Sequence, residues 1–159
     1  MGEPIVEWLN QQQDIMVELL RDLVDIDSNS FDKAGVDRAG ARLTAFFDDN
    51  EIPHETIPLE EYGDAIRAVV SGGDGNQPIL LCGHRDTVFP TGEVEKRPFS
   101  IADGKAFGPG VADMKPGLVI NAFILAAFHK FGGHPNPLVG LFTGDEEIGS
   151  PASQLSLIH

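Results

Sequence analysis

Hydrophobic residues recur at helical spacing in the first 50 residues of the chain. One series predicts an amphipathic helix that ends between residues 25 and 30; its members are Trp8, Leu9, Ile15, Met16, Leu19, Leu20, Leu23 and Val24. A second series predicts another helix that ends before Pro53; its members are Val36, Ala39, Leu43, Phe46 and Phe47. A third segment, from Pro116 to about Phe131, is apolar nearly all round and therefore predicts a deeply buried helix, which Gly132 and Gly133 end.

Short apolar runs between these helices predict strands. Residues 65–70 and 138–143 are two such runs, and residues 79–82 are continuously apolar, as is typical of a central strand covered on both faces. Residues 99–101 and 105–107 flank Asp103 and Gly104, which predicts a hairpin. Ser150 and Pro151 resemble the start of a helix that continues through Leu155 and Ile158. This alternation of strands and helices predicts α/β layers around a mixed sheet.

The composition is that of one ordinary globular domain. The chain has 159 residues, 42% of them hydrophobic, and a formal net charge of -14. This charge disfavours nucleic acid and anionic membranes as partners. The single cysteine, Cys82, excludes an intrachain disulfide and is expected in the core. The longest apolar stretch, residues 118–128, is too short to cross a bilayer, and the N-terminus lacks a signal peptide, so we expect a cytoplasmic protein.

Polar residues with metal-binding side chains follow two of the predicted strands. His84 and Asp86 follow residues 79–82, and Glu146 and Glu147 follow residues 138–143. Sites in open α/β sheets form beyond the carboxyl ends of the strands, so these side chains are expected in one crevice, where Asp113 could join them from its loop. A histidine that binds metal usually donates its other N–H to a carboxylate, and the spacing of His84 and Asp86 suits that arrangement.

Each group also has a purely structural interpretation. His84 and Asp86 could satisfy a loop, Asp113 could cap the helix that begins at Pro116, and the acidic run at 145–147 could be a solvated turn. The run directly follows a strand predicted to be buried, which favours chemistry. Of two neighbouring carboxylates, one can bind metal while the other serves as general base, and spacing alone leaves open which does which.

Taken together, the three clusters resemble the motifs of the dinuclear-zinc exopeptidases and deacylases, the family of acetylornithine deacetylase, succinyl-diaminopimelate desuccinylase and glutamate carboxypeptidase. The resemblance is densest from Ile79 to Ser150, and residues 89–92, 97–99 and 106–110 lean toward the glutamate carboxypeptidase branch. It implies a three-layer αβα sandwich with a mixed sheet, of which residues 1–159 form the N-terminal part of the catalytic domain, without the lid domain. It also implies a cis peptide bond after Asp113.

The resemblance assigns a role to each candidate residue. His84 and Glu147 correspond to ligands of two different zinc ions, and Asp113 to the carboxylate that bridges both. Asp86 corresponds to the residue that orients His84, and Glu146 to the general base. The implied reaction is hydrolysis of an amide next to a free carboxylate, in a small peptide or an N-acyl amino acid. A glutamate-type carboxypeptidase is favoured, with a desuccinylase-like or deacetylase-like amidohydrolase as the alternative.

The chain also departs from this family pattern. Two further zinc ligands and the lid are expected downstream, and His159 is an unsuitable substitute because it lies in the predicted last helix. We therefore expect weak metal binding and little turnover from these 159 residues alone. The alternatives are a piece of a longer enzyme, a short protein completed by another chain such as a second copy, or a non-catalytic binding module. Arg85 should point away from the metals, and Pro116 replaces a glycine that is common in the family.

Overall fold

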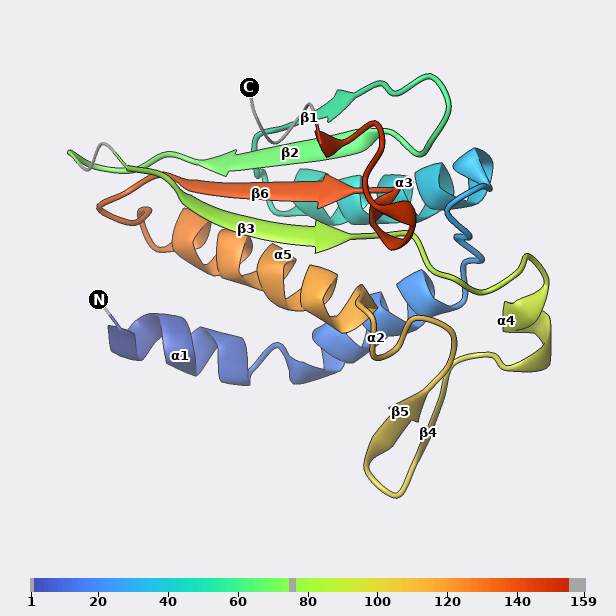
Figure 1. Cartoon of the computed structure of the whole chain (residues 1–159). Helices are drawn as coiled ribbons and strands as arrows, with labels where there is room; N and C mark the ends of the chain where they lie inside the picture. Colours follow the sequence, from blue (N-terminus) through green and yellow to red (C-terminus); the bar gives the residue numbers. More distant parts are fainter. Residues whose placement is uncertain (1, 75–76, 155–159) are drawn as a thin grey trace.

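A four-stranded mixed sheet lies at the centre of the computed structural model, which describes residues 2–74 and 77–154. The strand order is β1-β2-β6-β3 (Figure 1), with bounds β1 His54–Ile57, β2 Ala65–Val70, β3 Ile79–His84 and β6 Leu138–Thr143. β2 pairs antiparallel with β1 and β6, whereas β3 pairs parallel with β6. The predicted α/β fold with a mixed sheet is confirmed, and β2 and β6 have the predicted bounds.

Four helices lie on one face of this sheet (Figure 1). α3 (Lys33–Asp49) and α5 (Lys115–Lys130) pack on the strands, and α1 (Gly2–Asn10) and α2 (Gln13–Val24) pack against α5 farther from the sheet. Of the three expected layers, the described residues thus form the sheet and the helical layer on one face. The core lies between sheet and helices, where Phe47 contacts Phe142 with ring centroids 5.6 Å apart and Phe46 contacts Phe123 at 4.8 Å.

The first predicted helix is broken in two. The backbone N–H groups of Gln11 and Gln12 donate to the carbonyls of Trp8 and Leu9, which makes a tight turn between α1 and α2. This break allows both helices to contact α5. Strand β1 and the short helix α4 (Glu93–Lys96) have no counterpart in the sequence-based prediction; β1 is partly exposed and lacks a regular apolar pattern.

Strand β3 corrects two expectations. It lies at the edge of the described sheet, and Leu80 is 50% exposed, so the prediction of a central strand covered on both faces is wrong for this part of the chain. Cys82 is exposed as well and is no core residue. Within residues 2–74 and 77–154, α5 covers one face of β3 and β6 is the only strand that pairs with it, which explains both differences. The strand also extends two residues further than predicted and ends at His84.

The buried helix and the hairpin are confirmed. α5 begins at Lys115, and Gly132 and Gly133 follow it with φ angles of 90° and 86°. The hairpin of β4 (Ser100–Ala102) and β5 (Lys105–Phe107) projects from the body of the molecule (Figure 1). Gln154 donates its N–H to the Ser150 carbonyl, but the rest of the predicted last helix, with Leu155, Ile158 and His159, lies outside the described residues. Among the helices described, none is long and apolar enough to cross a membrane.

Candidate metal centre

Two neighbouring parallel strands deliver the first side chains of the centre. His84, the last residue of β3, stands in register with Thr143, the last residue of β6, and the Arg85 N–H continues the ladder to the Thr143 carbonyl at 2.9 Å. After β6 the chain turns into the 3-10 helix η1 (Glu146–Ile148). The turn needs Gly144, because a Cβ there would lie 2.6 Å from Val36 Cγ1. The parallel pairing thus places the imidazole and the acidic run at the same edge of the sheet.

Asp113 reaches the same place from the loop before α5. Its Oδ1 lies 3.2 Å from His84 Nε2, and a cis peptide bond joins it to Met114. The capping interpretation does not hold, because Met114 occupies the N-cap position of α5 and no side chain of the described residues caps the helix there. The Asp113 carboxylate is 75% exposed and therefore remains accessible to a cation.

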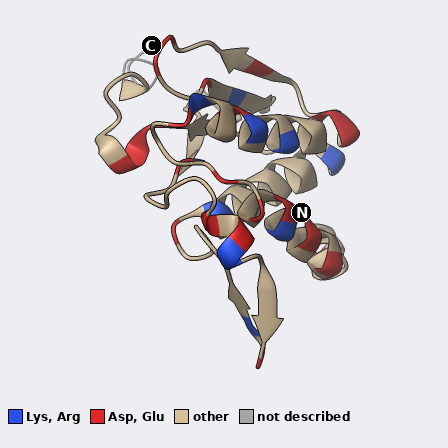
Figure 2. Ribbon diagram, turned by 90° about the vertical axis from the view of Figure 1, so that its right-hand side faces the viewer, with Lys and Arg blue, Asp and Glu red and all other residues tan. Residues whose placement is uncertain are grey.

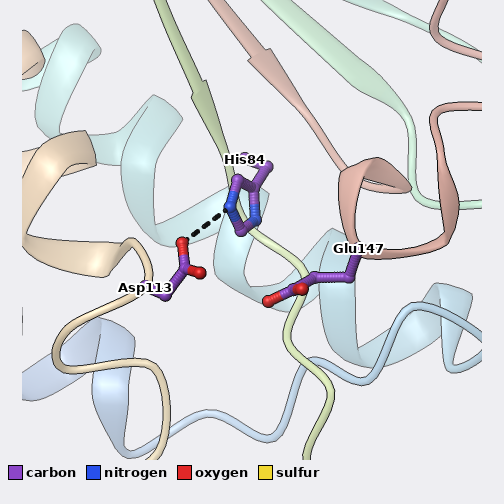
Figure 3. Close-up of side chains that lie close together, drawn as sticks. All are labelled: His84, Asp113 and Glu147. Carbon is purple, nitrogen blue, oxygen red and sulfur yellow. Dashed lines mark hydrogen bonds and ion pairs between the residues drawn. The ribbon is translucent and has the colours of Figure 1, made fainter.

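His84, Asp113 and Glu147 point toward one another (Figure 3). Each offers one ligand atom, and these atoms all lie within 4.8 Å of one another. Zinc binds nitrogen and carboxylate oxygen at 2.0–2.2 Å, so two ligands of one ion are at most about 4.4 Å apart. A separation of up to 4.8 Å fits one ion after a small movement, or two ions that share Asp113. The donor set of one imidazole and two carboxylates suits a divalent cation such as zinc.

Glu146 also faces the imidazole, but from a different position. Its Oε2 lies 3.5 Å from His84 Nε2, and its side chain is 55% exposed. Asp145, the first acid of the run, is instead fully buried, and its Oδ2 accepts hydrogen bonds from the backbone of Ala152 and Ser153. The three acids are therefore no uniformly solvated turn, and only Glu146 and Glu147 turn toward the centre.

Asp86 organises the buried side of the site. Its backbone carbonyl lies 3.0 Å from His84 Nδ1, and its Oδ1 lies 3.4 Å from the same nitrogen. Its two carboxylate oxygens accept the N–H groups of Glu146 at 3.2 Å and Glu147 at 3.1 Å. Burial by itself raises the pKa of Asp86, but hydrogen bonds from His84, Ser30 and these amides outweigh burial and lower the pKa. One ionised carboxylate thus holds both the imidazole and η1.

The electrostatics of the centre favour a cation. Burial lowers the pKa of His84, but the carboxylates of Asp86 and Glu146 outweigh this effect and raise the pKa to about 9. The pKa of Glu147 is raised by burial and, against the opposing effect of His84, by the charges of Asp113, Asp86 and Glu146. Four carboxylates therefore surround one imidazole, and a bound cation would relieve their repulsion.

Basic residues do little to offset the negative charge of these carboxylates. Acidic residues outnumber basic ones in the chain, 25 against 11, and both are spread over the ribbon (Figure 2). Arg85 turns away from the centre, as expected, and donates to the backbone carbonyls of Val36, Asp64 and Thr143. Burial lowers the pKa of Arg85 to about 10 despite the nearby carboxylates, so this side chain stays charged but serves the fold.

Two buried residues near the centre were not predicted from the sequence to support it. Ser30 donates its hydroxyl to Asp86 Oδ2 at 2.7 Å. Lys115 donates its Nζ to the carbonyls of Leu23 and Ile26, at 2.8 Å each, and so fastens the start of α5 to the end of α2. A lysine at the start of an otherwise apolar helix was a usable signal for Lys115. Ser30 had none, because a serine after a helix is an ordinary turn residue.

An open pocket of about 220 Å³ lies beside the centre. His84 and Glu146 form its polar side, and its remaining lining residues are mainly apolar: Cys82, Gly83, Met114, Leu141, Thr143 and Ser150. Although Cys82 is exposed overall, partial burial raises the pKa of its thiol. The pocket offers space for part of a small substrate next to the candidate ligands.

Comparison with known proteins finds relatives that include a carboxypeptidase and a deacetylase. The chain is 31% identical over 147 residues to carboxypeptidase G2 from Pseudomonas sp. (strain RS-16), with 90% of this chain and 35% of the relative covered. It is 34% identical over 140 residues to acetylornithine deacetylase from Salmonella arizonae, with 82% of this chain and 36% of the relative covered. The chain therefore spans about a third of the length of the curated relatives it matches.

Solved structures share the fold. Human carnosine dipeptidase 1 superposes with a TM-score of 0.81 at 19% identity, over 98% of this chain and 37% of that one. A dinuclear metal-binding peptidase of the M20 family from Bacillus subtilis superposes with a TM-score of 0.63 at 15% identity, over 94% of this chain and 39% of that one.

Residues 80–159, half of the chain, match the family described as peptidase family M20/M25/M40. This match includes β3, β6 and the candidate ligands His84, Asp113 and Glu147. It supports a metallopeptidase or amidohydrolase function, in agreement with the cluster of metal-binding side chains. The chain belongs to peptidase family M20/M25/M40.

Proposed function

We propose that this chain carries part of the active site of a zinc-dependent hydrolase that cleaves the amide bond of N-acyl amino acids or a C-terminal peptide bond. The observation that carries the proposal is the convergence of His84, Asp113 and Glu147, which come from three separate segments and bring their ligand atoms within 4.8 Å. Chance contacts between acidic groups are common, but here an imidazole and four carboxylates share one edge of the sheet.

The proposed roles are those that the family resemblance implies, and the geometry of the site is compatible with them. His84 and Glu147 are proposed to hold different zinc ions, and Asp113, whose carboxylate lies near both and is accessible, to bridge them. The cation, when bound, supplies Lewis acidity that acidifies a water and polarises a carbonyl. Glu146 is more exposed than His84 and stands beside it, so we assign it the proton transfer from the attacking water to the leaving amine. Asp86 orients His84 through Nδ1.

The substrate proposal rests on relatives and on sequence segments of this chain. Both named relatives, a carboxypeptidase and an acetylornithine deacetylase, support an acylated amino acid or a short peptide as substrate. Because residues 89–92, 97–99 and 106–110 lean toward the glutamate carboxypeptidase branch, we favour a glutamate-type carboxypeptidase over a deacetylase-like or desuccinylase-like amidohydrolase. We also propose a cytoplasmic location.

Metal binding tests the first half of the proposal. Calorimetric titration of the metal-free chain with zinc should show stoichiometric binding that Asp113→Ala removes. Saturation at two ions per chain supports the dinuclear site. A chain that folds but binds no zinc would instead support a non-catalytic module on the same scaffold.

Hydrolysis tests the second half. The zinc-loaded protein, as the 159-residue chain and as any longer polypeptide that its gene encodes, is assayed with N-acetyl amino acids and with dipeptides that end in glutamate. Glu146→Gln should abolish cleavage while zinc binding persists, because this change removes the proton acceptor and leaves the proposed ligands intact. Cleavage that survives Glu146→Gln would contradict the assigned role.

A further inference from the structure

Residues 25–30, in the segment between α2 and α3, support the sheet side of the candidate metal centre. This segment precedes residues 80–159, which match the family description. Ser30, at its end, is 2% exposed and donates its hydroxyl to Asp86 Oδ2 at 2.7 Å across 56 positions of sequence. Both partners are buried, so water cannot replace this hydrogen bond without a rearrangement.

Asp86 connects Ser30 to the candidate metal-binding residues through hydrogen bonds. Oδ2 accepts hydrogen bonds from Ser30 and from the N–H of Glu147, while Oδ1 accepts the N–H of Glu146 and faces His84 Nδ1 at 3.4 Å. These contacts set the plane of one carboxylate from both sides. If the hydroxyl is lost, Oδ2 keeps one donor, and the carboxylate gains freedom to rotate away from His84 and η1.

The neighbouring residue Ser28 shows that burial alone does not explain the contact. Ser28 is also buried, at 1% exposure, but its hydroxyl has no hydrogen-bond partner within residues 2–74 and 77–154. Only its backbone carbonyl contributes, by accepting the Thr87 N–H at 2.8 Å. The same short segment thus contains two buried hydroxyls, of which Ser30 donates to Asp86 and Ser28 has no partner among the described residues.

The remainder of the segment fastens the chain that follows Asp86. Asn29 donates its side-chain amide to the Phe89 carbonyl at 3.0 Å, and Asp27 accepts the N–H groups of Gly92 and Val94. Asn29 and Thr87 also form an isolated parallel bridge. Ser30 is therefore held on a segment that is itself bonded along the loop leaving the metal centre, which gives its hydroxyl a defined position.

We propose that Ser30 is a positioning residue of the metal centre, acting through Asp86 on His84, Glu146 and Glu147. The inference rests on the proposed function for its effect on metal, whereas its effect on Asp86 does not require a metal. Partners beyond the direct ligands typically change metal affinity by 10–100-fold, and Ser30 acts one contact further out, so we expect a loss of about tenfold.

The test compares matched serine variants of the 159-residue chain. Cobalt titration followed by visible absorption reports both affinity and coordination geometry. Ser30→Ala should weaken cobalt binding about tenfold and change the absorption spectrum. Ser28→Ala, the matched control, should leave both unchanged, and Ser30→Thr, which keeps a hydroxyl, should restore binding. Equal affinities of Ser30→Ala and Ser28→Ala would overturn the proposal. If Ser30→Ala fails to fold, Ser30→Cys, with a similar volume and a weaker donor, takes its place.

A metal-free measurement separates this proposal from the proposed function. Amide hydrogen exchange at Glu146 and Glu147 reports their bonds to Asp86 directly. Ser30→Ala should accelerate exchange at both amides several-fold, while Ser28→Ala should not. If the wild-type chain binds no cobalt but these amides respond, the metal function fails and the positioning role stands. If cobalt binds and neither the amides nor the affinity respond to Ser30→Ala, the positioning role fails and the metal function stands.

Discussion

The two sides of the candidate metal centre are held in place differently. On the sheet side, His84 is 5% exposed, and the fully buried Asp86 binds it together with the backbone of Glu146 and Glu147. On the loop side, the Asp113 carboxylate is 75% exposed, and within the described residues its hydrogen-bond partner is His84. The sheet side belongs to the core, whereas the loop side presents a ligand to solvent.

Because of this difference, folding stability should depend mainly on the sheet side, whereas metal affinity should depend on both sides. The contacts of Asp86 are part of the buried hydrogen-bond network, so damage there costs both folding and function. Asp113 owes its place to its backbone, which Lys115 anchors to the end of α2, and its side chain buries little surface. We therefore expect substitutions on the two sides to give opposite ratios of lost stability to lost metal affinity.

The largest effect is expected for Asp86→Ala. Removing one partner from a buried, hydrogen-bonded charge pair costs about 4 kcal/mol, and here it also strands the amides of Glu146 and Glu147. Urea unfolding at neutral pH in the absence of metal measures this loss. Asp86→Asn, which keeps an accepting oxygen, should lose less. A cost for Asp86→Ala below about 1 kcal/mol would contradict the view that the sheet side supports the fold.

Asp113→Ala should show the reverse. Zinc affinity is expected to fall by more than about 100-fold, since loss of a ligand exceeds the effect of losing an outer partner. The free energy of unfolding should change by less than about 0.5 kcal/mol, as for other exposed side chains. Calorimetry and urea unfolding of the same preparation give both values. The exposed Asp14→Ala serves as control and should leave zinc affinity intact. Strong destabilisation by Asp113→Ala would remove the contrast between the two sides.

A rise in pH should weaken the contacts that His84 makes on the sheet side. The pKa of His84 is about 9 in the folded chain, against 6.5 for its ordinary value, so the folded chain binds more protons between these limits. The resulting stabilisation is complete below pH 6.5 and is lost as pH rises through 9. Without metal, the free energy of unfolding should therefore fall by about 1.5 kcal/mol between pH 6.5 and 8.

Zinc affinity should move in the opposite direction over this range, rising about tenfold per pH unit, because the metal competes with the proton on His84. Urea unfolding with a chelator, and calorimetry without one, measure the two trends. His84→Gln should flatten the stability profile. We limit this prediction to pH values up to 8 because of Lys115, whose pKa burial lowers to about 8. Above that pH the unfolded chain binds more protons at Lys115 than the folded chain does, so this group adds stability as pH rises. A stability that rises from pH 6.5 to 8 would contradict the assigned state of His84.

The smallest effect is expected where the two sides touch. A Cβ on Gly83 would lie 2.9 Å from Leu118 Cδ2 and 3.2 Å from Met114 Cε, so Gly83→Ala should press α5 and the Asp113 loop away from β3. Because both contacts are with the ends of flexible side chains, we expect a cost of about 1 kcal/mol and a slight loss of zinc affinity. Gly73→Ala, whose nearest neighbour would be 3.6 Å away, is the control. Equal behaviour of the two variants would mean that the sides are not coupled by packing.

Much of the architecture follows from local sequence patterns. The strands β2 and β6 and the apolar helix α5 have the expected positions. Hydrophobic periodicity and turn residues predict them because these signals depend only on residues close together in the sequence. The failures are at elements whose state depends on partners. The strand β1 exists because β2 pairs with it, and the break between α1 and α2 follows the surface of α5. The exposure of β3 reflects which faces other elements cover.

The candidate ligands were recognisable because each stands beside a strand end or a helix start that the sequence shows. Ser30 was not recognisable, because its partner Asp86 lies 56 residues away and only the packed loop brings them together. The burial of Asp145 was hidden in the same way, since its amide partners, Ala152 and Ser153, belong to the following turn. Neighbouring acids look alike in a sequence, and only packing separates the buried Asp145 from the more exposed candidate residues beside it.

What the sequence by itself determined is the family and most of the helices and strands, but not β1, α4 or the break between α1 and α2, because hydrophobic period, turn residues and motif spacing are local properties of the chain. The tertiary structure alone decided which carboxylate approaches which nitrogen of His84, which acid is buried, and which serine supports the centre. Those choices depend on side-chain directions and on contacts between residues far apart in the chain, and the free energy that selects them arises only when the elements pack together.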